Sequence, residues 1–154
     1  MKRLALILAG VAIDANAVEP PRHDTDRALC AAVLILEAGG EIDPRTGHSR
    51  ASMAAVWEVI WQRAENRKLT PVGVVTQRKQ FSCLNNITAG RAIATAQKHP
   101  FWRHAIGITA APPLTRYTGE ADHYHANTIR APYWADPAKK TVTIGKHTFY
   151  KLKP

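Results

Sequence analysis

One carboxylic acid stands out because of the residues that precede it. Glu37 follows the almost wholly apolar run Ala31–Leu36. A carboxyl group held against apolar atoms loses hydration, which penalises its charged form. Such a group keeps its proton near neutral pH and can give it to a leaving sugar oxygen, as a general acid does. For the residue taken alone, a glutamate at an exposed helix end is the commoner case, so the context must decide.

Two more acidic residues, Glu41 and Asp43, come shortly after Glu37. Most glycosidases use two catalytic carboxyl groups that flank the sugar linkage. Gly39 and Gly40 separate Glu37 from Glu41 and favour the end of a helix between them, so the two carboxyl groups need not share a face. We therefore expect Glu41 to bond to the turn and orient the site in a supporting role.

Three histidines suggest a metal site. On a strand, His123 and His125 point to the same face, and His147 follows later in the chain. Three imidazoles with one open position would form a zinc site of the catalytic kind. The chain has no H-E-x-x-H motif, and we favour a groove lined by polar and aromatic side chains, with no metal and no other cofactor.

Several amide, hydroxyl and aromatic side chains fall in predicted loops and short strands. Flat rings stack on the C–H faces of sugars, and amides bond to sugar hydroxyl groups, although the same side chains also occur as simple core residues. The candidate sugar-contacting residues are Gln80, Phe81, Ser82, His123, Tyr124, His125, Tyr133 and Trp134.

The chain has two cysteines, Cys30 and Cys83. In an exported protein they could form a disulfide, and two buried free thiols are an equal alternative. Cys83 paired with a histidine would instead suggest an amidase or peptidase, but nothing local supports that pairing.

Hydrophobic periodicity predicts the elements that hold these residues. A helix from Asp26 to Ala38 puts Glu37 in its last turn, and a second helix begins at Ser49 and ends near Arg67. The pattern favours an α+β fold that is mostly α, with a small antiparallel β element near the C-terminus. Shorter helices are expected at 71–76, 88–99 and 101–110, irregular structure at 77–86, and strands at 123–125, 141–144 and 148–152.

The N-terminus has the features of a signal peptide. A basic start, an apolar run that is shorter than the about 20 residues of a membrane span, and an A-x-A site follow one another. We expect cleavage near Ala17 and export to the periplasm or the cell exterior. The predicted divisions are a signal peptide at 1–17, a linker at 18–25 and a single catalytic domain at 26–154.

The formal net charge of +9 points to a polyanionic neighbour, such as nucleic acid, anionic lipid or the bacterial envelope. The cations are scattered and form no run typical of a nucleic-acid tail. Together with the predicted export, this favours the anionic envelope over nucleic acid, and we expect a monomer.

Segments in a fixed order resemble the cell wall hydrolase family typified by spore cortex-lytic enzymes. The first is AVLILEAGGE at Ala32–Glu41, and a helix with Met53–Val56 and Arg63 follows it. The resemblance covers about residues 28–151. The later segments are Gln80–Ser82, ADHYHA at 121–126, PYWA at 132–135 and IGKHTFY at 144–150.

The resemblance implies a lysozyme-like or lytic-transglycosylase-like domain that acts on peptidoglycan glycan strands without a metal. It implies that Glu37 protonates the oxygen between N-acetylmuramic acid and N-acetylglucosamine. Glu37 would then take the proton from the muramic acid 6-hydroxyl, which closes a 1,6-anhydro ring. Two alternatives stay open: a non-catalytic peptidoglycan-binding protein, and a zinc-dependent wall amidase or peptidase that uses His123, His125 and His147.

Overall fold

The computed structural model describes residue 18 and residues 24–41 and 48–154. The predicted signal peptide, most of the predicted linker and Asp43 lie outside the described residues. Within the described ranges, no helix combines the length and the apolar character that crossing a membrane requires.

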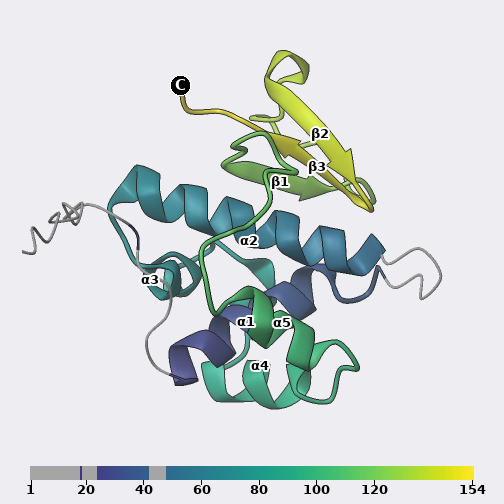
Figure 1. Cartoon of the computed structure of the whole chain (residues 1–154). Coiled ribbons are helices and arrows are strands. Elements are labelled where there is room, and N and C mark those ends of the chain that lie inside the picture. Colours follow the sequence, from purple (N-terminus) through teal and green to yellow (C-terminus); the bar gives the residue numbers. More distant parts are fainter. Residues whose placement is uncertain (1–17, 19–23, 42–47) are drawn as a thin grey trace, which may run out of the picture.

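Five α-helices and one three-stranded antiparallel sheet form in the described part of the chain, which confirms the predicted α+β class. The long helix α2 lies between the sheet and the other helices (Figure 1). The sheet has the strand order β1-β3-β2. The helices are α1 (Asp24–Ala38), α2 (His48–Arg67), α3 (Pro71–Thr76), α4 (Ala89–Ala96) and α5 (Trp102–Ile108), with short 3-10 helices η1 (Ser82–Leu84) and η2 (Pro137–Lys139). The strands are β1 (His123–Ala126), β2 (Lys140–Ile144) and β3 (His147–Tyr150).

Helix α1 is the buried centre of the helical body. Asp24 and Asp26 stand in its first turn, where carboxylates interact favourably with the positive end of the helix dipole. The residues from Leu29 to Ile35 are all buried, and the helix packs against α2, α3, α4 and α5. It ends at Ala38, and any side chain at the next residue, Gly39, would overlap the carbonyl of Ile35. Glu37 is thereby fixed at the end of a rigid, buried element.

The inner face of the sheet packs on the helices. Tyr124 of β1 pairs with Phe149 of β3, and both join a cluster with Ala55 and Val59 of α2. Because side chains alternate along a strand, His147 shares this inner face. The outer face of the sheet carries His123, His125, Thr143, Thr148 and Tyr150.

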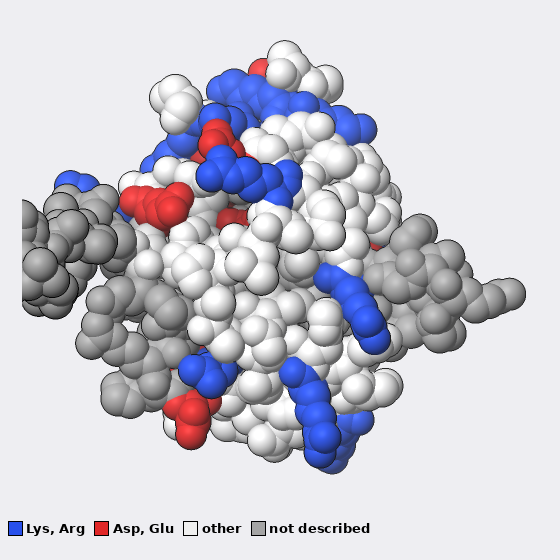
Figure 2. Space-filling view, in the orientation of Figure 1, with Lys and Arg blue, Asp and Glu red and all other residues white. Residues whose placement is uncertain are grey.

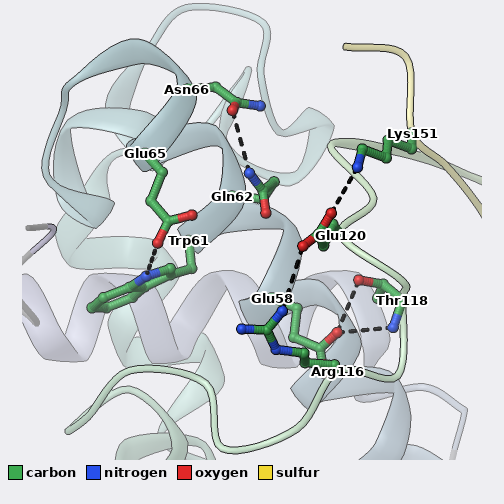
Figure 3. Close-up of polar contacts among 9 residues, drawn as sticks. All are labelled: Glu58, Trp61, Gln62, Glu65, Asn66, Arg116, Thr118, Glu120 and Lys151. Carbon is green, nitrogen blue, oxygen red and sulfur yellow. Dashed lines mark hydrogen bonds and ion pairs between the residues drawn. The ribbon is translucent and has the colours of Figure 1, made fainter. Parts of the chain in front are cut away.

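A buried glutamate on another side of α2 holds the connection between α5 and β1. The Glu58 carboxylate accepts hydrogen bonds from the backbone N–H groups of Tyr117 (2.9 Å) and Thr118 (2.8 Å) and from the Thr118 hydroxyl (2.8 Å; Figure 3). A cavity of about 290 Å³ lies beside it, and Trp61 and Glu65 are among its lining residues. With its oxygens engaged in this way, Glu58 serves the fold.

Candidate active site

Glu37 lies where the end of α1 meets β1. The Tyr124 hydroxyl donates a hydrogen bond of 3.0 Å to Glu37 Oε2. The other oxygen, Oε1, is buried and has no hydrogen-bond partner among the described residues. Buried polar atoms in native proteins nearly always have a partner, so an exception of this kind singles out Glu37 as a candidate functional group. The carboxyl group thus has one anchored oxygen and one that is not engaged.

Tyr124 is itself held firmly. Its ring packs on the edge of His147, with ring centroids 5.2 Å apart, and against Phe149, with centroids 5.5 Å apart. Burial, and then the charge of Glu37, raise the pKa of Tyr124 well above its ordinary value. The phenol therefore keeps its proton and remains a hydrogen-bond donor to Glu37.

A buried cation approaches the same place from α2. Arg63 donates from Nε to the backbone carbonyl of Asp122 at 2.7 Å, and its guanidinium lies over the Phe81 ring, 5.5 Å from the centroid. Burial lowers the pKa of Arg63, and the charges of Tyr124 and Glu37 are among those that oppose this shift. Within the described residues its Nη1 is buried and has no partner. A donor and an acceptor without partners therefore occur in the surroundings of Glu37.

The thiol of Cys83 also neighbours Glu37. Burial raises the pKa of Cys83, and the carboxylate of Glu37 raises it further. A cysteine nucleophile needs the opposite shift, usually supplied by a histidine or another cation. This environment argues against the cysteine amidase or peptidase alternative. Cys83 and Cys30 are both free thiols.

Glu41 forms the centre of a second buried cluster. Ser52 donates a hydrogen bond of 2.6 Å to Glu41 Oε2, and His147 Nδ1 lies 2.5 Å from Oε1 in an ion pair when the imidazole is protonated. Gly145 packs so closely that a side chain there would collide with Glu41 and Ser52. Glu41, three residues beyond the end of α1, is thereby tied to α2 through Ser52 and to the β2–β3 turn. Sequence reasoning missed Ser52 and gave Gly145, which lies in the resembling segment 144–150, no packing role, because nothing local in the sequence signals such long-range contacts.

Of the predicted sugar-contacting residues, Tyr124 is the one that bonds to Glu37. Gln80 accepts a hydrogen bond of 2.8 Å from Arg67, and Ser82 is exposed at the start of η1. Phe81, which packs under Arg63, is buried. The segment from Gln80 to Ser82 therefore lies next to the site, mainly through its phenylalanine.

The other predicted residues lie on the outer side of the sheet. His123 and His125 point away from the helices because they alternate with Tyr124 along β1. Trp134 covers them, with ring centroids 5.2 Å and 6.0 Å from theirs, and Tyr133 is fully exposed. The structure thus does not bring these four side chains to Glu37.

The three histidines considered as zinc ligands are also divided between the two faces. His147 is on the inner face and pairs with Glu41, whereas His123 and His125 are on the outer face. In the described ranges, no group of three or more histidine, cysteine, aspartate or glutamate side chains is arranged to hold a metal ion. The three histidines named for the zinc alternative therefore do not form one ligand set.

Comparison with known proteins gives two matches. A family model described as Cell Wall Hydrolase matches residues 47–150; this segment contains Tyr124 and His147 and begins after Glu37 and Glu41. The fold is similar to that in the crystal structure of the catalytic domain of the Bacillus cereus SleB protein, with a TM-score of 0.57 and 22% sequence identity. This similarity covers 91% of the present chain and 99% of that chain. No curated protein matches the chain.

Proposed function

Since the chain belongs to the cell wall hydrolase family, we propose that it cleaves the glycan strands of peptidoglycan as a lytic transglycosylase with Glu37 as its catalytic acid and base. One observation carries this proposal. Glu37 stands on a rigid buried helix, with Oε2 anchored by Tyr124 and Oε1 buried without a partner in the described structure. A general acid needs such a fixed orientation, and Oε1, which has no partner in the described structure, is the oxygen that would carry the proton.

The proposed reaction needs a single carboxyl group. Glu37 gives its proton to the oxygen that links C1 of N-acetylmuramic acid to N-acetylglucosamine, and the C1–O bond breaks. The Glu37 carboxylate then takes the proton from the muramic acid 6-hydroxyl, whose oxygen bonds to C1 and closes the 1,6-anhydro ring. Glu37 ends protonated, ready for another cycle. If water took the place of the 6-hydroxyl, the product would be a reducing sugar.

Glu41 supports this mechanism from outside the reaction. Both of its oxygens face partners within the protein, Ser52 and His147, so it is badly placed to act as the second carboxylate of a conventional glycosidase. By fixing the chain just after α1, Glu41 holds the end of the helix that carries Glu37. We assign it a positioning role.

The surroundings of the enzyme are part of the proposal. With a net charge of +9, the chain is suited to the anionic bacterial envelope. Export to the periplasm or the cell exterior would bring it to peptidoglycan.

The test compares Glu37→Gln with Glu65→Gln, a change at an exposed carboxylate on α2. Purified sacculi are digested and the soluble products are identified by mass spectrometry. We expect Glu37→Gln to keep its circular dichroism spectrum and release no muropeptides, and Glu65→Gln to behave as the parent does. Anhydro ends would support the transglycosylase, reducing ends a hydrolase, and persistent lysis by Glu37→Gln would overturn the assignment.

A further inference from the structure

Four aromatic rings pack together on the outer face of the sheet, opposite Tyr124, and the fully exposed Tyr133 comes directly before one of them, Trp134, in the chain. We call these five residues the outer aromatic patch: His123, His125, Tyr133, Trp134 and Tyr150. The His125 ring stacks on Tyr150, with centroids 5.6 Å apart and planes at 24°, and its Nε2 lies 3.2 Å from the Tyr150 hydroxyl. Trp134 stands edge-on to Tyr150 at 5.7 Å. The four packed rings therefore have defined orientations; Tyr150 is buried among them, and His123, His125 and Trp134 are partly exposed.

Packing explains part of the patch but leaves one member without a structural role. Trp134 contacts three rings and covers the sheet. Tyr133, the residue before it, is 102% exposed, whereas the exposed Tyr117 elsewhere still buries half of its surface at 50%. A ring held fully in water stabilises nothing within the fold, so this ring is available to a binding partner.

Positive charge is concentrated in the segment that follows β1, although one of its cations, Lys151, pairs with Glu120 at 2.7 Å. The segment 127–154 holds six Lys and Arg residues and one acidic residue, Asp136, which gives a net charge of 6 − 1 = +5. Lys and Arg side chains gather over the sheet at the top of Figure 2. All six cations are exposed: Arg130, Lys139, Lys140, Lys146, Lys151 and Lys153.

We propose that the outer aromatic patch binds a glycan strand of peptidoglycan at a site separate from Glu37. Flat rings can stack on the C–H faces of the sugars, while the cations of segment 127–154 attract the carboxylates of the peptide stems. This inference rests on the proposed function, because it assumes that peptidoglycan is the substrate. Two contacts with one insoluble polymer raise the effective concentration of substrate at the catalytic carboxyl group.

An anionic membrane is the competing partner, and the composition of the surface disfavours it. Insertion into lipid favours large aliphatic side chains on the binding face. In the described segment 127–154, Ile129 is the exposed large aliphatic residue, and the outer face also presents the exposed Thr143. Rings, hydroxyl groups and cations together fit an anionic sugar polymer better.

The test measures binding by the full chain carrying Glu37→Gln, which leaves the polymer uncut. The target is purified sacculi stripped of teichoic acid and protein. Adding Tyr133→Ala should weaken binding roughly fivefold or more, and Tyr133→Trp should restore it. The matched controls are Tyr117→Ala, at an exposed tyrosine, and Arg91→Ala, at an exposed cation on α4; both should bind as the parent does. Equal binding by Tyr133→Ala and the parent would overturn the proposal.

Two further arms separate the possible failures. If the parent binds vesicles of phosphatidylglycerol and phosphatidylcholine and Tyr133→Ala removes that binding but not binding to sacculi, the patch is a membrane site and the proposal is wrong. With Glu37 intact, Tyr133→Ala should lower the rate on sacculi relative to the rate on short soluble glycan fragments. If the parent cuts neither substrate, the proposed function fails, while the sacculus-binding arm still reports on the patch.

Discussion

The phenol of Tyr124 holds Glu37 at Oε2 across a separation of 87 residues in sequence, through a hydrogen bond of 3.0 Å. Helix α1, which carries the carboxyl group, and strand β1, which carries the phenol, lie on opposite sides of α2 (Figure 1). The ring of Tyr124 also touches His147, the partner of Glu41. Glu37 and Glu41 are therefore connected through the sheet as well as through the end of α1.

Tyr124→Phe should slow catalysis while leaving substrate affinity nearly unchanged. The change removes the donor that orients Glu37, at a cost of about 1–2 kcal/mol, so kcat should fall roughly 5–30-fold. Steady-state kinetics on soluble glycan fragments would check this, with Tyr117→Phe as a control at an exposed tyrosine. A raised KM with unchanged kcat would show instead that Tyr124 contacts the sugar.

Gly145→Ala should destabilise the fold by roughly 2–4 kcal/mol. Gly145 has a φ of +56°, and a side chain there would collide with Glu41 and Ser52. Gly90→Ala is the matched control, because a side chain at this position in α4 meets nothing within 4 Å and should stabilise the helix by about 0.5–1 kcal/mol. Urea denaturation gives both free energies of unfolding, and equal values for the two variants would contradict the packing described here.

Asp122 should make stability depend on pH in the acid range. Burial alone would raise the pKa of Asp122, but hydrogen bonds from His123 and from the backbone of Leu152 and Lys153 lower it below its ordinary value of 3.8. A carboxyl group whose pKa is lower in the folded state stabilises the fold above the unfolded value. That contribution is lost as the pH falls through the folded value.

The measurement is urea denaturation of the parent and of Asp122→Asn from about pH 6 to pH 2. The variant should be less stable at pH 6 by about 1–3 kcal/mol, and the difference should narrow below pH 4. Asp136→Asn, at an exposed aspartate, provides the comparison. A constant difference between the parent and Asp122→Asn at every pH would rule out the proposed linkage.

Both thiols should react slowly in the folded protein. Burial, and then the charge of Asp26, raise the pKa of Cys30 to about 12, and burial and Glu37 raise that of Cys83. Because the thiolate is the reactive form, alkylation by iodoacetamide at pH 8 should be at least roughly tenfold slower in the folded chain than in urea. Peptide mapping would report each site, and rapid labelling of Cys83 in the folded chain would contradict the environment assigned to it.

Local sequence rules predicted the helices well. They did not predict element ends that depend on contacts between residues far apart in sequence. Thr70 caps α3 through a hydrogen bond to the Gly73 N–H and Pro71 opens the helix, as such residues do. The predicted strand at 148–152 instead ends at Tyr150, because the N–H groups of Leu152 and Lys153 bind the Asp122 carboxylate. No local pattern announces a partner so far away in sequence.

The candidate site was predictable at Glu37 itself, and less so in its surroundings. An apolar run that stops at two glycines marked the carboxyl group, and Tyr124 was expected in the groove. His123, Tyr124 and His125 are adjacent in sequence, but side chains alternate along a strand. Tyr124 therefore reaches Glu37, whereas the two histidines lie on the outer face of the sheet. Which face a strand presents depends on its docking, which the sequence pattern of HYH does not specify.

Tyr124 belongs to the sheet, whose strands follow all five described helices in the sequence. This order affects when the chain can act. Domains are synthesised from the N-terminus, so α1 emerges long before β1 and β3. A partly made chain then carries the proposed acid without its hydrogen-bond donor and without the His147 that braces that donor. On the proposed function, the full catalytic rate is thus reached only once the strands have been added to the helices.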